Sequence, residues 1–163
     1  MNRRAFATSI VIVPTMAGLG YAGWRYFSEK AQHTCSACSR EVHVQTRTVA
    51  VIDGKLGIYC CPACALSEHR QVGKPVQIME LADYQGGPVI SPSQAVLVHD
   101  SEINPCKNHN TTLTADKQPL HSHYDRCSPS ILAFRDRNSA QRFAAEHGGQ
   151  VIAFSEMASQ FSR

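Results

Sequence analysis

The chain has 163 residues, of which 43% are hydrophobic and 18% are charged, values typical of a folded protein with one domain or two small ones. Arg3, Arg4 and Arg25 lie in the first 25 residues without any acid, so the remaining 13 basic and 13 acidic side chains balance. A balanced chain lacks the basic excess of nucleic-acid-binding proteins, and the composition argues against a nucleic-acid partner.

Residues 1–30 have the pattern of an export signal or a membrane anchor. Arg3 and Arg4 precede Phe6 in an order that resembles a twin-arginine signal, and residues 5–24 carry no charge. Such a segment can just cross the hydrocarbon core, with its arginines left in the cytoplasm. We expect the rest of the chain on the periplasmic side of the inner membrane, or free in the periplasm if the segment is cleaved. A buried helix of a soluble protein is the remaining alternative.

Residues 31–90 predict a cysteine-rich unit with the element order ββαβ. Strands are expected at 42–52 and 56–60, and Asp53-Gly54 between them is a hairpin turn signal. Pro62 suits the first turn of a helix that runs to about residue 71, and Gly73 suits its end. A third strand is expected at 76–81.

Residues 91–163 predict the same order of elements. Strands are expected at 95–99, 131–134 and 151–154, with a last short helix over 155–161. Asp136 or Asn138 can cap the main helix, and Gly148-Gly149 can end it. The fold class is therefore α+β, with two related small ββαβ units after the N-terminal segment. A polar stretch at 100–125 interrupts the second unit, and loops of this length are usually functional or disordered.

Cysteine is the residue type that points most directly to function. The chain has seven cysteines, so complete pairing within one chain is impossible and at least one thiol is free, binds metal or pairs elsewhere. Two Cys-x-x-Cys pairs, Cys35 with Cys38 and Cys61 with Cys64, can supply four thiolates to zinc or, with fewer ligands, to cuprous ion. The second pair begins a helix, where the partial positive charge favours thiolate. Cys60 could replace Cys61 as a ligand or belong to the core.

Two other interpretations of these cysteines stay open. Structural disulfides are favoured in the periplasm, which would make the chain a disulfide-stapled assembly protein. Cys61 and Cys64 at a helix start could instead form the redox site of a thiol-disulfide oxidoreductase, although the ββαβ order differs from the usual frame of that site.

A second group of candidate ligands lies in and after the long polar stretch. It combines thiol and imidazole side chains, which suit copper or zinc, and consists of Cys106, His109, His121, His123 and Cys127. Loop histidines are also often merely solvated. The sequence contains no phosphate-binding glycine loop, no nucleophile elbow and no paired carboxylates at a diagnostic spacing, so we do not expect an enzyme.

The C-terminal unit resembles the end of the NosL family, accessory copper-binding proteins for nitrous oxide reductase. The resemblance is carried by Ile131-Leu-Ala-Phe134, by Phe143-Ala-Ala-Glu-His-Gly-Gly149 and by Phe154-Ser-Glu156. It covers residues 128–157, while the segment around Cys35–Cys38 and Tyr59-Cys-Cys-Pro-Ala-Cys64 resembles small treble-clef metal domains. The family has a methionine just before the first of these strands, where this chain has Cys127, and it is typically lipid-anchored, whereas no lipid-attachment box is present here.

The resemblance implies a copper chaperone or metal-delivery factor of the cell envelope. Its partner would be a client cuproenzyme such as nitrous oxide reductase, and its membrane contact would be made by the N-terminal helix. We expect one ion, structural zinc, at the two Cys-x-x-Cys pairs. We expect a second, exchangeable cuprous ion at Cys127 with the neighbouring histidines or Cys106.

Overall fold

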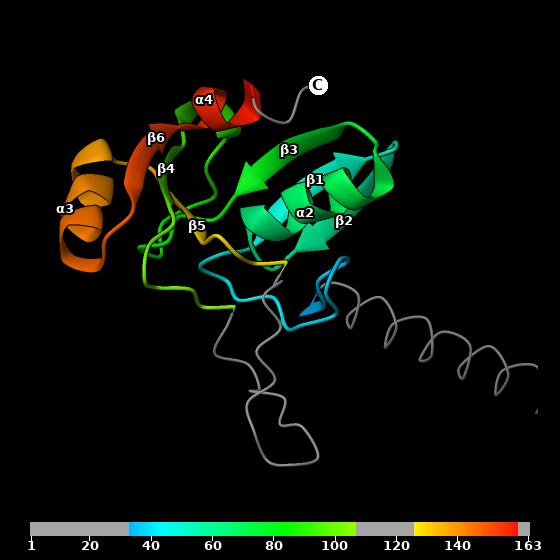
Figure 1. The fold of residues 1–163 in the computed structure, drawn as a ribbon, viewed down its shortest axis with the longest axis horizontal. Helices are drawn as coiled ribbons and strands as arrows, with labels where there is room; N and C mark the ends of the chain where they lie inside the picture. The colour runs from blue at the N-terminus through cyan, green and yellow to red at the C-terminus, as the bar shows by residue number, and fades with distance from the viewer. Residues whose placement is uncertain (1–32, 107–125, 160–163) are drawn as a thin grey trace, which may run out of the picture. The chain divides into compact units, whose positions relative to one another are not determined.

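The computed structural model describes residues 33–106 and 126–159. The predicted anchor at residues 5–24 lies outside the described residues, as do His109, His121 and His123. Within the described ranges, no helix is both long and apolar enough to cross a membrane. Residues 34–163 belong to one compact unit, which contains two small three-stranded antiparallel sheets and short helices (Figure 1).

The first sheet is built from β1 (Thr48–Ile52), β2 (Lys55–Tyr59) and β3 (Val76–Leu81), in the order β2-β1-β3. Asp53 and Gly54 both have positive φ, at 52° and 73°, as the two-residue hairpin turn predicted from the sequence requires. The first strand begins six residues later than expected. The amides of Thr46 and Arg47 both donate to the carbonyl of His43, and this turn replaces the extended backbone predicted there.

Helix α2 (Pro62–Val72) follows β2 after only two residues and packs against the first sheet. Pro62 is its first residue, and Gly73 ends it in the left-handed conformation with φ of 63°, both as predicted. The residues of its first turn and a half are buried, whereas the end of the helix is exposed. The cysteines at its start therefore lie in the interior.

The second sheet has the order β5-β4-β6, with β4 at Val96–His99, β5 at Ile131–Phe134 and β6 at Gln150–Ala153. In both sheets the first strand in sequence lies in the middle, between the second and the third, so the two units share one strand arrangement. The short helix η1 (Pro92–Gln94) leads into β4, and α4 (Phe154–Ser159) follows β6.

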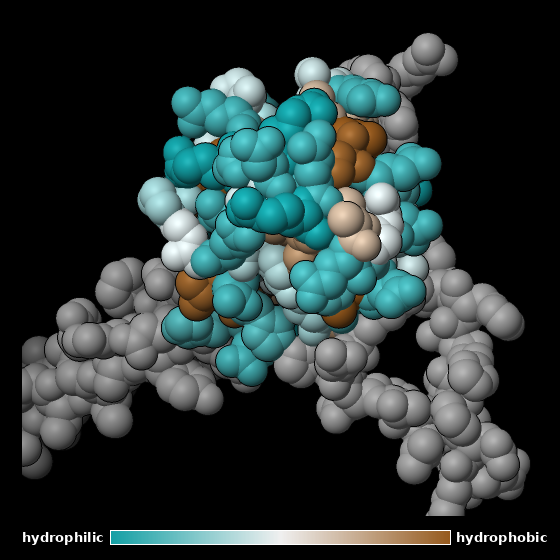
Figure 2. All heavy atoms as spheres, turned by 90° about the vertical axis from the view of Figure 1, so that its left-hand side faces the viewer, coloured by the Kyte–Doolittle hydropathy of each residue, from teal (hydrophilic) through white to brown (hydrophobic). Residues whose placement is uncertain are grey.

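Helix α3 (Arg137–His147) covers the second sheet. Its N-cap is Asp136, whose side chain accepts a hydrogen bond of 2.8 Å from the amide of Ser139, one of the two caps predicted. Hydrogen bonds from Ser139 hold the pKa of the Asp136 carboxyl below its ordinary value. The outer face of α3 is hydrophilic, as Figure 2 shows for this side of the molecule.

The two sheets share a hydrophobic core. The larger buried cluster joins Ala50 and Ile78 of the first sheet to Leu97 and Ala133 of the second, and it includes six buried cysteines beside these aliphatic side chains. A smaller cluster lies under α3, where the ring centroid of Phe134 is 5.2 Å from that of Phe143. The burial of one such large apolar side chain contributes ~1.5–3 kcal/mol. This packing holds the segments that carry the cysteines.

Candidate metal centre

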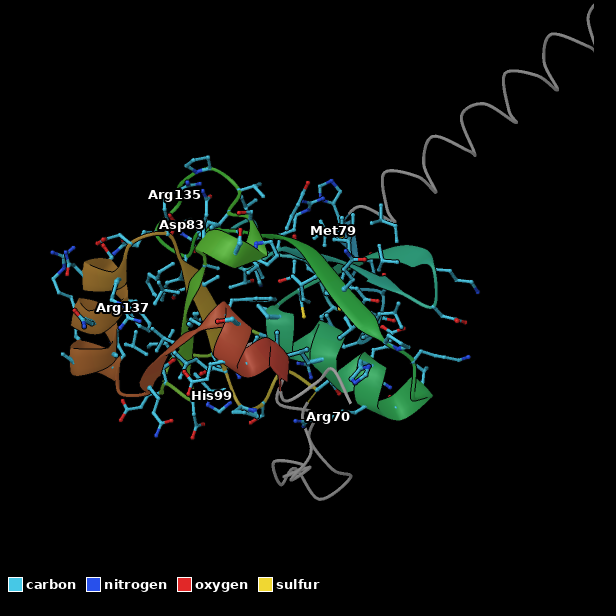
Figure 3. The ribbon with its side chains drawn as sticks, turned by 90° about the horizontal axis from the view of Figure 1, so that it is seen from above. Arg70, Met79, Asp83, His99, Arg135 and Arg137 are labelled. Carbon is cyan, nitrogen blue, oxygen red and sulfur yellow. The ribbon has the colours of Figure 1, made fainter. Side chains whose placement is uncertain are left out.

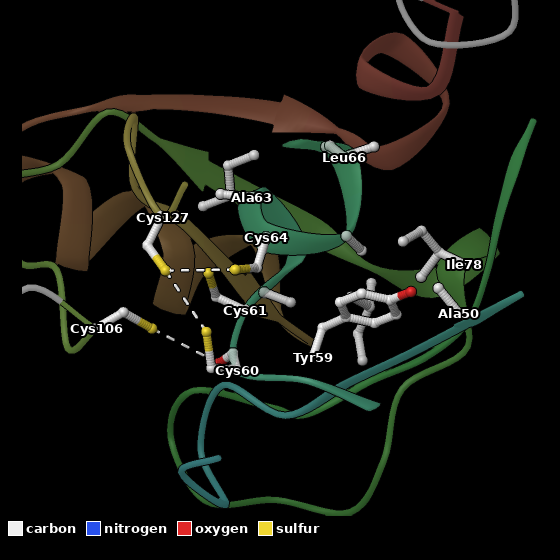
Figure 4. Packing of buried hydrophobic residues seen from close by; sticks show 14 of the residues in the cluster. Ala50, Tyr59, Cys60, Cys61, Ala63, Cys64, Leu66, Ile78, Cys106 and Cys127 are labelled. Carbon is white, nitrogen blue, oxygen red and sulfur yellow. Dashed lines mark hydrogen bonds between the residues drawn. The ribbon is translucent and has the colours of Figure 1, made fainter. Parts of the chain in front are cut away.

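All seven cysteines lie within the described residues, and all seven are free thiols. They come from four segments: the turn at 35–38, the junction of β2 and α2 at 60–64, the end of the segment after β4 at 106, and the segment before β5 at 127. Figure 4 shows the sulfur atoms of the last three segments directed toward one another at the start of α2. We call these seven residues the cysteine cluster.

Sulfur atoms of the cluster form two groups, and in each group all ligand atoms lie within 4.8 Å of one another. The first group is Cys35, Cys38, Cys60 and Cys64, and the second is Cys60, Cys61, Cys64 and Cys127. The Sγ atom of Cys60 lies 3.6 Å from that of Cys38 and 3.5 Å from that of Cys127, and Cys127 Sγ lies 3.7 Å from Cys64 Sγ.

These separations suit a metal shell. With zinc–sulfur bonds of about 2.3 Å, tetrahedral geometry places neighbouring sulfurs about 3.8 Å apart. Because the observed sulfur separations of 3.5, 3.6 and 3.7 Å are close to that spacing, the thiols need little movement to coordinate an ion. A shell made of sulfur alone suits soft ions such as cuprous ion, and also zinc.

The structure groups the cysteines differently from the sequence prediction. Cys60, rather than Cys61, joins Cys35 and Cys38. Cys61 has an extended backbone as the N-cap of α2, and neighbouring residues of an extended chain direct their side chains to opposite sides. Only one of the two adjacent thiols can therefore face the turn at 35–38. The second group joins Cys127, which the sequence assigned to a separate site, to the α2 cysteines.

The turn that carries Cys35 and Cys38 is fixed by backbone hydrogen bonds. The amide of Cys35 donates to the carbonyl of Arg40 at 2.8 Å, and that of Ser39 donates to the carbonyl of Cys35 at 3.0 Å. Ser39 has a φ of 59°, which closes the turn, and the amide of Ser36 donates to Ile58 of β2. The turn is thus attached to the strand that ends in Cys60.

Polar residues that the sequence analysis did not single out hold the other two segments in place. Asn104 donates to the carbonyl of Cys127 at 2.7 Å and accepts from the amide of Cys106 at 3.2 Å, so it joins the segments at 106 and 127. Arg126 donates to the carbonyl of Ala37 at 2.6 Å. No spacing in the sequence marks these residues, because each acts on a segment distant along the chain.

Arg40 places a positive charge at the edge of the cluster. Its Nη1 atom donates to the carbonyl of Cys106 at 3.1 Å and lies 3.6 Å from Cys127 Sγ. A guanidinium beside a thiolate stabilises the ionised sulfur, which is the form that binds metal.

The thiols of the cluster influence one another's ionisation. A hydrogen bond with Cys106, followed by others within the cluster, lowers the pKa of Cys127. Hydrogen bonds with Cys127 and Cys35 raise the pKa of Cys38 to about 11. Some thiols therefore accept hydrogen bonds as thiolates, while others keep their protons and donate. Without a bound cation, the thiols of the cluster do not all ionise together. Metal binding would replace the shared protons.

Six of the seven cysteines are buried, and the exposure of the seventh distinguishes it from the rest. Cys38 is half-buried, while Cys60 and Cys64 are fully buried. A separate cavity of about 240 Å³ lies on the side of α2 where Figure 3 labels Arg70 and His99. No cysteine lines that cavity, so it is not an entrance to the cluster. Among the described residues, Cys38 is the most accessible sulfur.

Comparisons with known proteins do not assign this chain to a family. No family model matches the chain, and no curated protein matches it. Among solved structures, the crystal structure of the copper chaperone NosL from Shewanella denitrificans is similar at 15% identity and a TM-score of 0.45, over 77% of this chain and 90% of that chain. Similarity at this level does not establish a shared family, so the metal assignment rests on the geometry of the cysteines.

Proposed function

We propose that this protein is a copper-binding accessory protein of the cell envelope, which carries cuprous ion in its cysteine cluster and delivers it to a client cuproenzyme. The observation that supports this proposal is the convergence of free thiols into two groups with metal-shell spacing. The envelope location and the client follow from the sequence expectations, including the resemblance to the NosL family. The ion is cargo, so its exchange matters as much as its affinity.

The half-buried position of Cys38 suits exchange. A metal ion moves between two thiolate proteins when an incoming sulfur replaces one existing ligand at a time, and this requires one accessible ligand. Cys38 can leave the ion and admit a client ligand, while the fully buried Cys60 and Cys64 keep their hold on it. Arg40 favours thiolate at Cys127, and the start of α2 favours thiolate at the cysteines beside it.

The oxidoreductase alternative has less support. Attack on a substrate disulfide requires an accessible thiolate, and Cys61 and Cys64 are 4% and 0% exposed. The structural zinc ion expected at the two Cys-x-x-Cys pairs remains a prediction, because four thiolates suit zinc as well as copper. The predicted contribution of His109, His121 and His123 to the copper site also stays a prediction.

The test is a competition titration of the reduced full-length protein with a chromophoric cuprous chelator, followed by transfer to a second chelator. We expect tight cuprous binding in the wild type. Replacement of Cys38 by Ser should slow transfer at least tenfold, while Ser36→Ala, a change on the same turn, should leave it unchanged. Metal content of the purified protein measures any resident zinc. A wild type that does not compete with the chelator, or in which alkylation finds no free thiols, would overturn the proposal.

A further inference from the structure

The two sulfur groups overlap, and the overlap has a consequence for how many ions the cluster holds. Cys60 and Cys64 belong to both groups, whereas Cys35 and Cys38 belong only to the first, and Cys61 and Cys127 belong only to the second. We propose that the cluster holds at least two cuprous ions at once, with the thiolates of Cys60 and Cys64 bridging them. This inference rests on the proposed copper-binding function and specifies its stoichiometry.

The position of Cys60 supports a bridging role. Its Sγ atom lies 3.6 Å from Cys38, a member of the first group only, and 3.5 Å from Cys127, a member of the second group only. Cys64 Sγ, the other shared sulfur, lies 3.7 Å from the Sγ atom of Cys127, which belongs only to the second group. The two shared sulfurs therefore lie between the unshared ones.

The number of sulfurs also fits a bridged arrangement. One ion takes at most four thiolates, which leaves part of the cluster without a ligand role. Two separate four-thiolate shells would need eight sulfurs, but the two groups together contain only six different cysteines. Bridging satisfies both shells with these six, so fewer thiolates are buried than two separate shells would need, and each shared thiolate contacts two cations.

The local structure makes the shared pair rigid. Cys60 follows the last residue of β2, and Cys64 lies in the first turn of α2, where its amide donates to the carbonyl of Cys61 at 3.1 Å. Both side chains have 0% of their surface exposed. Bridging ligands must keep two ions at a fixed separation, and buried side chains on adjoining regular elements do so better than side chains on a loop.

Binding through shared ligands should be cooperative, because the first ion ionises and orders two ligands of the second. Native mass spectrometry of the reduced full-length protein at half-saturation with cuprous ion should show apoprotein and a species with two or more ions, with little of the one-ion form. X-ray absorption at the copper edge should show a short copper–copper vector. A single bound ion would have no copper neighbour, so it would give no such vector.

Cysteine variants distinguish a ligand shared by two ions from a ligand that binds one ion only. Cys35→Ser removes a ligand of the first ion only, and one ion should remain bound without a copper–copper vector. Cys60→Ser should weaken both ions, and Ser36→Ala, at an exposed position on the same turn, is the control that removes no sulfur. Circular dichroism of each reduced apoprotein identifies variants that fail to fold. If a variant does not fold, the number of ions bound by the wild type still tests the proposal.

The outcomes distinguish the two proposals. Saturation of the wild type at one ion per chain, or independent filling of two sites without a copper–copper vector, would overturn the bridged cluster and leave the copper-binding function intact. Complete absence of cuprous binding would overturn the function itself.

Discussion

Arg40 is the side chain whose charge bears most directly on the cysteine cluster. Replacement by Ala removes the hydrogen bonds of its guanidinium to the Cys106 carbonyl and to Cys127 Sγ. A hydrogen bond to a charged group is worth ~1.5–3 kcal/mol, so we expect cuprous affinity to fall about tenfold or more. Arg40→Lys should recover only part of this loss, because the lysine ammonium is a compact charge that is more strongly hydrated than a guanidinium. Chelator competition measures each affinity.

The control for Arg40 is Arg47, the residue that immediately precedes β1. Arg47 makes an ion pair of 3.6 Å with Glu80 on the surface of the first sheet, away from the cluster. Arg47→Ala removes the same type of charge from the molecule, so a general electrostatic effect would weaken copper binding in both variants equally. Equal losses would contradict the specific role of Arg40.

Sequence reasoning at this scale identified the cysteines as candidate ligands but did not predict how they are grouped. The Cys-x-x-Cys spacing predicted that Cys35 and Cys38 share a site with α2, and the structure places them beside Cys64. The inclusion of Cys127 with the same group could not be predicted, because it depends on how the second sheet packs against the first. Arg40 and Asn104 were missed for the same reason.

Helix α3 is the element whose start is most clearly specified. Because hydrogen bonds from Ser139 lower the pKa of Asp136 from its ordinary value of 3.8, the ionised cap stabilises the folded state above that pH. The stabilisation is lost as the pH falls through the lower folded pKa. We expect Asp136→Ala to lower the melting temperature at pH 7, with a difference from the wild type that shrinks below about pH 4.

The matched change at this position is Asp136→Asn, which keeps an oxygen that can accept from the Ser139 amide. Thermal unfolding followed by circular dichroism should show little loss for this variant at pH 7. A loss as large as that of Asp136→Ala would mean that charge, rather than the hydrogen bond, is the contribution of the cap.

Most helices and strands could be predicted because their signals are local. The Asp53-Gly54 turn, Pro62, Gly73 and the Asp136 cap each specify a backbone conformation by residue type, and the structure confirms all of them. The start of β1 was predicted too early, since Val44 is 85% exposed in a turn despite its high strand propensity. The arrangement of the two sheets around one core depends on distant contacts, which no local pattern shows.

For the whole molecule, metal binding and folding stability should be linked. The ligands converge only in the folded state, so bound ion stabilises that state by about 2.7 kcal/mol at a hundredfold excess of free ion over its Kd. Cuprous loading should therefore raise the melting temperature of the reduced protein, and a strong chelator should reverse the rise. A protein alkylated at its thiols serves as the control and should not respond. An unchanged melting temperature on loading would contradict this linkage.

Cys127 of the second half of the chain lies beside Cys64 of the first half, so an ion bound by both has a topological effect. Cys64 and Cys127 are 63 residues apart, so an ion held by both closes a loop of that length. A permanent cross-link over such a loop removes about 4 kcal/mol of chain entropy from the unfolded state. Under the proposed function, a bound cuprous ion would therefore act as a reversible cross-link between α2 and the segment before β5. Its release would open this link, so we expect the ion-free protein to be the form most readily degraded by proteases.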